Sequence, residues 1–250
     1  MSLNELITEN QIKPPRIVLY GPPKMGKSTF ASQMPNPLCL DFENGLDAIK
    51  MKRVDCRNDY DKAIEAITLL HNEEHDFQTI AVDSADWLES ALFDKLCKQY
   101  NRPSILDNSK GSEFAFGRGM NIAVNEFSMF LQGLTSLRDN KGMATIIIAH
   151  DSIKQFDDPL ADSYDQHNIK LSKHLAAKLT EWADCLLFVR DKPIIKDDGD
   201  KKRQAGSIRT LYTQPVGGAI AGNRYGLPPE LPFSWDKFIE AFNATLNKGE

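Results

Sequence analysis

The chain has 250 residues, of which 41% are hydrophobic and 26% are charged, as in ordinary globular proteins. Its length permits one large α/β domain or two small ones. The net charge of −5 argues against a surface that is basic overall, although a few clustered Lys and Arg can still form a local basic channel.

Neither the start of the chain nor its cysteines indicate export. Residues 1–5 are not basic, no apolar h-region follows them, and the longest apolar runs are short and strand-like. We therefore expect no signal peptide, no membrane span and a cytoplasmic location. The four cysteines lack C-x-x-C spacing, so we expect reduced, mostly buried thiols rather than disulfides or metal ligands at Cys39, Cys56, Cys97 and Cys185.

Strand-like apolar runs alternate with helical patterns along most of the chain. The strands are expected at residues 16–20, 37–42, 77–83, 144–150 and 185–190, and the helices at 60–71, 85–100, 119–139 and 170–181. The strands carry Val, Ile and Leu at consecutive positions, as when helices cover both faces of a parallel sheet. This alternation predicts a doubly wound, mainly parallel α/β fold.

The pattern changes from about residue 192 onward. Two strand-like runs, 192–196 and 207–213, flank a polar turn and predict a β-hairpin. A Gly- and Pro-rich stretch then leads to an amphipathic helix over 234–246, with Ser234 as its N-cap. We expect an antiparallel extension of the same sheet and a closing helix, so that an N-terminal segment, 1–15, precedes a single domain, 16–250.

A phosphate-binding loop pattern follows the first predicted strand directly. It reads Gly21-Pro22-Pro23-Lys24-Met25-Gly26-Lys27-Ser28, with Thr29 next. A strand, a loop and a helix in this order aim backbone N–H groups and the positive end of the helix at one point, which suits a polyphosphate. Lys27 is expected to reach the β- and γ-phosphates, Ser28 to ligate Mg²⁺, and Thr29 to lie near the α-phosphate. The sequence therefore predicts a site for a nucleoside triphosphate.

Acidic residues end two further predicted strands. Asp83 follows a buried run and can hold Mg²⁺, the alternative being an Asp that caps the following helix. Asp41 and Glu43 end the second strand, and either carboxylate can activate water for hydrolysis, if they are not ordinary strand-end acids.

These motifs, in this order, resemble the RecA-like ATPase core of RecA recombinases, KaiC-type proteins and DnaB-type helicases. In that core a Glu in a context like I-D-x-E-x-x-L-D is the catalytic base, which favours Glu43 within Leu40–Asp47. The Asp83-Ser84 pair is typical of the Mg²⁺ strand. The family's sensor of the γ-phosphate, commonly Gln, stands here as His150, which looks like the phage branch grouped with single-strand-annealing recombinases. His150 at a sheet edge with satisfied hydrogen bonds is the alternative.

The phage branch also tends to end in a Lys-Asn-Arg-aromatic-Gly-Leu-Pro string. The chain has Asn223-Arg224-Tyr225-Gly226-Leu227-Pro228, with Gly222 in place of the Lys. The resemblance implies that Arg224 reaches a neighbour's nucleotide site as a finger, and hence that the chain forms a homo-oligomer, a ring or a filament. Lys24 either replaces the missing positive charge or is a solvated loop lysine.

Two segments are expected to be loops that line a DNA path in such an oligomer. The first, 101–118, mixes basic and aromatic residues, namely Arg102, Lys110, Phe114, Phe116 and Arg118, and either contacts single-stranded DNA or acts as a lid or subunit contact. The second, 151–169, is acidic and suits DNA poorly unless Lys154 and Lys170 dominate locally. The basic run 201–203 at the hairpin tip reads as a solvated turn rather than a DNA contact.

The resemblance implies a Mg²⁺-dependent ATPase, in the host cytoplasm if phage-encoded, that acts on single-stranded DNA in recombination, annealing or replication. Its implied partners are single-stranded DNA, copies of itself and, as a further candidate, a single-strand-binding protein. Two alternatives stay open: a nucleotide-switched loader of another factor onto DNA, and a P-loop small-molecule kinase. The kinase is disfavoured because the stretch after His150 is acidic rather than Arg-rich.

Overall fold

The structure is a computed structural model that describes residues 7, 12–157, 162–198 and 201–247. Most of the predicted N-terminal segment 1–15 lies outside these residues, and its division from a single domain 16–250 stays a prediction. The centre of the predicted polar turn, 199–200, also lies outside them. So do the side chains of residues 201–203, whose reading as a solvated turn is therefore still a prediction.

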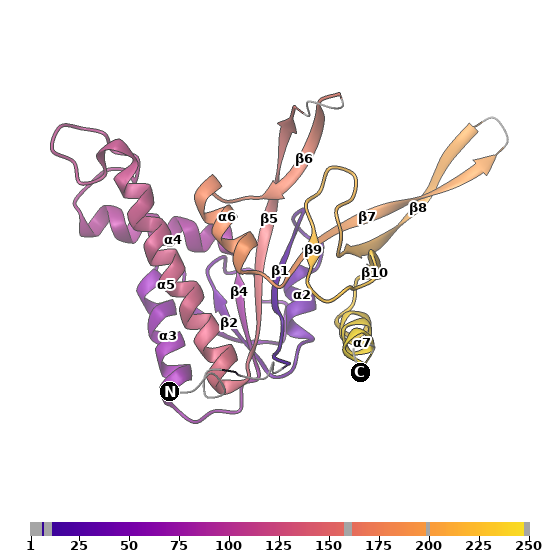
Figure 1. Ribbon diagram of the computed structural model, residues 1–250, viewed down its shortest axis with the longest axis horizontal. Helices are drawn as coiled ribbons and strands as arrows, with labels where there is room; N and C mark the ends of the chain where they lie inside the picture. The colour runs from indigo at the N-terminus through magenta and orange to yellow at the C-terminus, as the bar shows by residue number, and fades with distance from the viewer. Residues whose placement is uncertain (1–6, 8–11, 158–161, 199–200, 248–250) are drawn as a thin grey trace.

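One mixed sheet runs through the molecule (Figure 1). Its main path is β10-β8-β7-β1-β5-β4-β2-β3, and the strands from β7 to β3 along this path are parallel. Their bounds are β1 Arg16–Gly21, β2 Pro37–Asp41, β3 Lys52–Asp55, β4 Thr79–Asp83, β5 Ala144–Phe156, β7 Cys185–Asp198, β8 Lys201–Tyr212 and β10 Glu230–Pro232. Two further strands pair antiparallel off this path: β6 (Tyr164–Ile169) with β5, and β9 (Gly222–Asn223) with β7.

Helices cover both faces of the sheet because successive residues of the central strands point to opposite sides. On β1, Val18 and Tyr20 belong to one core and Ile17 and Leu19 to the other, and all four are fully buried. The first core is covered by α3 (Tyr60–Asn72), α4 (Ala85–Gln99), α5 (Arg118–Lys141) and α6 (Lys173–Trp182). The second is covered by α2 (Lys27–Ser32) and α7 (Trp235–Leu246). The predicted doubly wound α/β class, with an antiparallel C-terminal hairpin, is confirmed.

One prediction about the connecting segments is wrong, and one strand was not predicted. The segment 151–169 is not a loop throughout: β5 continues to Phe156 and pairs antiparallel with β6. Most residues of this strand pair are polar and at least partly exposed, so no apolar run marked the strands in the sequence. The edge strand β3 was not predicted, because three of its four residues, Lys52, Arg53 and Asp55, are charged.

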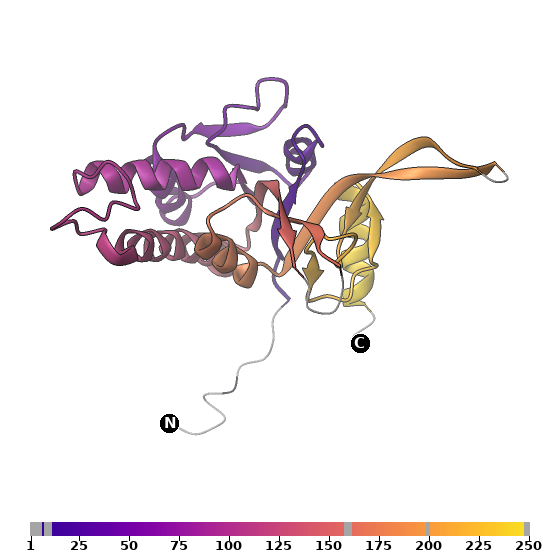
Figure 2. The same cartoon turned by 90° about the horizontal axis from the view of Figure 1, so that it is seen from above.

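Two antiparallel hairpins, β5–β6 and β7–β8, extend beyond the helix-covered part of the sheet (Figures 1 and 2). The longer one joins the predicted runs 185–190 and 192–196 into a single strand, β7. Ser234 stands at the N-cap of α7 as predicted, but its side chain makes no capping hydrogen bond.

The parallel register brings the ends of β1, β2 and β4 to one edge of the sheet, beside His150 in the middle of β5. Gly21 at the end of β1 pairs with His150 on β5, and Asp41 at the end of β2 pairs with Asp83 at the end of β4. β4 and β5 are themselves neighbours. In open α/β sheets ligands bind at this carboxyl edge, so the fold places the predicted site residues of separate segments side by side.

Candidate nucleotide-binding site

The phosphate-binding loop joins β1 to α2, as the sequence predicts. Gly21 and Gly26 each have a specific reason to be glycine. A Cβ on Gly21 would lie 2.3 Å from the carbonyl oxygen of Val189 on β7, so the neighbouring strand excludes a side chain there. Gly26 is the N-cap of α2 with a left-handed φ of +81°, a conformation that disfavours other residues.

A cavity of about 250 Å³ lies over this loop. It gathers predicted residues from four separate segments: part of the loop together with Glu43, Asp83 and His150. The lining residues are Lys24, Met25, Gly26, Lys27, Ser28, Thr29, Glu43, Gly45, Ile49, Asp83, Ile148 and His150. Gly21, Pro22 and Pro23 do not line it, and neither does Arg224.

Lys27 lies buried at the base of this cavity. Its ammonium donates hydrogen bonds to the carbonyl oxygens of Gly21 and Pro22, each at 2.8 Å. Burial lowers the pKa of Lys27, and the neighbouring carboxylate of Asp83 counteracts this effect. The positive charge is therefore held over the loop, where a polyphosphate would replace the carbonyl contacts with stronger, charge-assisted ones.

Ser28 and Asp83 form the oxygen pair expected of a Mg²⁺ site. The Ser28 hydroxyl donates to Oδ2 of Asp83 at 2.6 Å, although 55 residues separate the two in the chain. Burial raises the pKa of Asp83 to about 6, and a cation beside the carboxylate would favour its ionised form. Mg²⁺ commonly uses one or two protein oxygens and takes its other ligands from water and phosphate, so this donor set fits it. The described residues contain no cluster of three or more His, Cys, Asp or Glu arranged for a metal.

The structure separates the two candidate bases, Asp41 and Glu43. Asp41 is buried, and both its oxygens have partners: the backbone N–H of Asn44 at 2.7 Å and the Arg53 guanidinium at 2.9 Å. Glu43 lines the cavity, and 35% of its side chain is exposed. Asp41 therefore stabilises the turn after β2, whereas Glu43 has a carboxylate available for water.

His150 has a partner that sequence reasoning missed. Its Nδ1 lies 3.1 Å from both carboxylate oxygens of Asp86 in the first turn of α4, and a carboxylate accepts, so Nδ1 is the donor. Its Nε2 lies 3.9 Å from Oε2 of Glu43. The hydrogen bond to Asp86 raises the pKa of His150 despite burial. Burial acts to raise the pKa of Asp86, but His150 and the Ser84 hydroxyl outweigh it and lower that pKa to about 2.

The signal for Asp86 was present in the sequence but ambiguous. An acidic residue in the first turn of a helix is usually explained by the helix dipole alone. Only the pairing of β4 with β5, on which His150 lies, shows that this carboxylate has a second partner.

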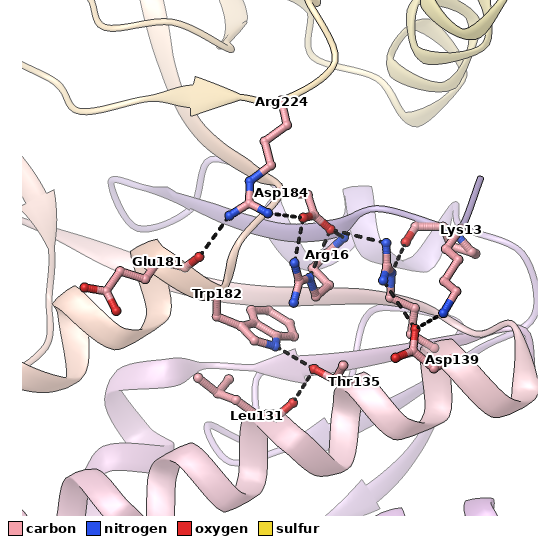
Figure 3. Close-up of polar contacts among 11 residues, drawn as sticks. Lys13, Arg16, Leu131, Thr135, Asp139, Glu181, Trp182, Asp184 and Arg224 are labelled. Carbon is pink, nitrogen blue, oxygen red and sulfur yellow. Dashed lines mark hydrogen bonds and ion pairs between the residues drawn. The ribbon is translucent and has the colours of Figure 1, made fainter. Parts of the chain in front are cut away.

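Arg224 lies near the start of β1, whereas the cavity lies over the loop that follows the end of β1; Figure 3 shows Arg224 beside Asp184 and Glu181. Its guanidinium donates to Oδ1 of Asp184 at 3.3 Å and to the carbonyl of Glu181 at 3.2 Å. Asp184 also accepts from the backbone and side chain of Arg16, where β1 begins. Since β1 is six residues long, about 17 Å separates this point from the phosphate-binding loop. Arg224 thus cannot complete the nucleotide site of its own chain.

The first predicted DNA loop, 101–118, divides into buried and exposed parts. Phe114 is 1% exposed and packs on Tyr100 at 5.1 Å between ring centroids, so its ring is not available to stack on a base. Phe116, two residues later, is 90% exposed at a left-handed φ of +59°. Arg102 pairs with Glu113 at 2.7 Å, and Arg118 donates to the carbonyls of Ala115 and Ser112. Both arginines hold the loop together, whereas Lys110 is exposed.

The remaining predictions concern single residues. Lys24 is exposed at the rim of the cavity, so it can be either a substitute positive charge or a solvated lysine. Gly222 lies on the short strand β9. The thiols of Cys39, Cys56, Cys97 and Cys185 are unpaired, and only Cys97 is partly exposed. No helix within the described ranges is long and apolar enough to cross a membrane.

Comparison with known proteins gives a family match over most of the chain. A family model described as "AAA domain" matches residues 13–225. The SPbeta prophage-derived uncharacterized protein YorG of Bacillus subtilis (strain 168) is 30% identical over 99 residues, which are 38% of this chain and 31% of that protein. The chain thus matches less than a third of this relative's length. The crystal structure of the RadB recombinase aligns over 90% of both chains with 14% identity and a TM-score of 0.48.

Proposed function

The chain belongs to the AAA domain family, and on that basis we propose that it is a Mg²⁺-dependent ATPase of the RecA-like P-loop type. One observation carries this proposal. The phosphate-binding loop, the Ser28–Asp83 pair, Glu43 and His150 meet at a single cavity, although they come from four separate segments. A binding loop alone would need only the first of these elements.

The phosphates would be held mainly by the loop and α2. Lys27 would exchange its contacts with Gly21 and Pro22 for the β- and γ-phosphates, and Thr29 would lie near the α-phosphate. Ser28 and Asp83 would hold the Mg²⁺, which offsets the negative charge of the phosphates during transfer.

Glu43 is the residue that we propose as general base. Its carboxylate would take a proton from the water that attacks the γ-phosphate. His150, held through Nδ1 by Asp86, presents Nε2 on the same side of the cavity, 3.9 Å from Glu43. A protonated Nε2 would donate to an oxygen of the γ-phosphate, and so report its presence to α4.

We further propose that hydrolysis serves single-stranded DNA in phage-type recombination, annealing or replication. The string 223–228, the sensor position of His150 and the prophage origin of the relative in Bacillus subtilis support this setting. Arg224 lies far from its own cavity but is 61% exposed, so it is available to a neighbouring copy, which supports a homo-oligomer. A single-strand-binding protein and a host cytoplasmic location belong to the same proposal.

The deciding measurement is steady-state ATP turnover with Mg²⁺, with and without single-stranded DNA, for the wild type and Glu43→Gln. A DNA-stimulated rate that Glu43→Gln abolishes is the expected result. ATP binding without turnover would favour a nucleotide-switched loader. Phosphoryl transfer to an added small molecule, with Glu43→Gln as active as the wild type, would favour a kinase and contradict the proposal.

A further inference from the structure

A tryptophan lies half-exposed at the start of α4, next to the nucleotide cavity. Trp87 is 47% exposed, although tryptophan is usually among the more buried residues. Three other large aromatic side chains are exposed to a similar degree or more in the described part of the chain: Phe116, Phe156 and Tyr164. Phe156 and Tyr164 pair with each other across the β5–β6 hairpin, with ring centroids 5.5 Å apart. Among the described residues, the ring of Trp87 makes no aromatic or cation–π contact of this kind.

Trp87 forms part of an open cleft of about 540 Å³, roughly twice the volume of the nucleotide cavity. One wall is the first half of α4. The other wall is the extension of β5 together with the residues between β6 and α6. The lining residues are Asp86, Trp87, Glu89, Ser90, Phe93, Ser152, Lys154, Lys170 and Leu171. We refer to this cleft, defined by these residues, as the Trp87 cleft.

The charges of the Trp87 cleft are arranged with the acids inward and the lysines outward. Asp86 is 10% exposed and is engaged by His150 and Ser84. Glu89 accepts a hydrogen bond from the backbone N–H of Ser172 at 2.9 Å, and burial raises its pKa. Lys154 and Lys170 are exposed, and Lys170 is 60% so. An incoming strand therefore meets two ammonium groups and an aromatic face before it meets either carboxylate.

Asp86 lines the Trp87 cleft and contacts His150, which lines the nucleotide cavity. Oδ2 of Asp86 lies 3.1 Å from Nδ1 of His150 and 3.6 Å from the ammonium of Lys170 in the Trp87 cleft. A ligand in the cleft that recruits Lys170 would change the electrostatic surroundings of the residue that orients His150. The Trp87 cleft is thus connected to the nucleotide cavity by the ion pair of Lys170 with Asp86 and the hydrogen bond of Asp86 with His150.

We propose that the Trp87 cleft binds single-stranded DNA, with a base stacked on Trp87 and backbone phosphates at Lys154 and Lys170. This inference rests on the proposed function and names the contact surface for its substrate. Aromatic faces combined with lysines are the usual way to bind single strands without reading their sequence, because every base has a π-face. The loop 101–118 offers less, since Phe114 is buried and its two arginines are paired within the loop.

The test is the affinity of the full chain for a fluorescently labelled oligo-deoxythymidine, with Mg²⁺ and a non-hydrolysable ATP analogue present. Trp87→Ala is expected to weaken binding by roughly 5- to 150-fold, the range for loss of one stacked base. Trp87→Phe keeps a stacking face and should retain most of the affinity. Phe116→Ala, the matched control for an exposed aromatic residue elsewhere, should bind like the wild type. Thermal unfolding of each variant checks that the fold is intact.

Lys154→Glu supplies an independent variant if Trp87→Ala does not fold, because it lies on the exposed extension of β5. It should weaken binding and reduce the slope of affinity against salt concentration, since one phosphate contact is replaced by a repulsion. If the wild type binds DNA and both Trp87→Ala and Lys154→Glu bind it equally well, the Trp87 cleft is not the DNA site. The proposed function would still stand. Loss of binding in Phe116→Ala alone would move the site to the loop tip. Absence of DNA binding by the wild type would overturn both proposals.

Discussion

Nδ1 of His150 lies 3.1 Å from both carboxylate oxygens of Asp86, and this contact fixes which ring nitrogen faces the nucleotide cavity. The two residues come from β5 and α4, 64 positions apart in the chain. Because Asp86 can only accept, Nε2 is left for a ligand on the side of Glu43.

Replacing Asp86 by Asn should lower ATP turnover by about 10²-fold, the cost of a misplaced catalytic group, while ATP still binds. The pH dependence of ATP turnover gives a second readout of this contact. Asp86 raises the pKa of His150 above its usual value near 6.5, so wild-type activity that needs protonated His150 persists above that pH. In Asp86→Asn the loss of turnover at alkaline pH should begin at a lower pH. Burial then lowers the pKa of His150 without the opposing effect of the Asp86 carboxylate. Asp94→Asn, an exposed acid on the same helix, is the control, and a loss that begins at the wild-type pH in Asp86→Asn would refute the positioning role.

Glu43→Gln should bind ATP normally but turn it over roughly 10²- to 10⁴-fold more slowly, since the attacking water loses its general base. Asp41→Asn makes the informative comparison. It should chiefly lower the thermal midpoint, because Arg53 and the backbone N–H of Asn44 lose a charged acceptor. Turnover at the wild-type rate in Glu43→Gln would show that the base assignment is wrong.

Arg224→Ala should bind ATP yet lose about 10³- to 10⁵-fold in turnover if it serves a neighbouring copy, as other fingers supplied in trans do. Stability should change little, because Asp184 keeps its bonds to Arg16. Mixing Arg224→Ala with Lys27→Ala should restore part of the activity, since a mixed interface can pair an intact loop with an intact finger. Arg57→Ala, which removes only an exposed pair with Asp55, is the control. No rescue on mixing, with turnover independent of protein concentration, would make Arg224 a structural residue.

Phe114→Ala should destabilise the fold by about 3–5 kcal/mol, the usual cost of removing a buried aromatic ring, and Phe116→Ala by no more than about 0.5 kcal/mol. Urea unfolding of the two variants measures this directly. Equal stabilities would mean that the Tyr100–Phe114 contact is not part of the core.

Asp184→Asn should lower the free energy of unfolding at neutral pH by about 3 kcal/mol, the lower end for a broken buried ion pair, since the arginines around it reach solvent. Burial acts to raise the pKa of Asp184, but the hydrogen bonds from Arg16 outweigh it and hold that pKa below its usual range. The pair therefore stabilises the fold above the unfolded pKa of about 3.9 and ceases to do so as pH falls below it. The difference between wild type and variant should be constant from about pH 5 to 8 and shrink below about pH 4. A difference that persists at pH 2 would assign it to packing instead.

The place of the phosphate-binding loop between β1 and α2 could be predicted from the sequence because all its determinants are contiguous. The glycines, Lys27 and Ser28 fall within eight residues after an apolar run, and the backbone of so short a segment is fixed by local geometry. The alternation of strands and helices likewise gave the α/β class, since buried parallel strands have a distinctive apolar pattern.

What lies around that loop was decided by strand order, which no local pattern specifies. Strand-end position alone leaves Asp41 and Glu43 open as the base, and the pairing of β2 with β3 brings Arg53 to Asp41 and not to Glu43. Phe114 and Phe116 both read as loop aromatics, and a left-handed turn at Phe116 sends one into the core and the other into solvent. Asp86 meets His150 because β4 lies beside β5, and Arg224 stands far from its own loop because β9 pairs with the start of β7. The sequence determined which chemical groups the chain carries. The tertiary structure decided which of them meet at one site, because the burial of a side chain and its hydrogen-bond partners depend on contacts between distant segments.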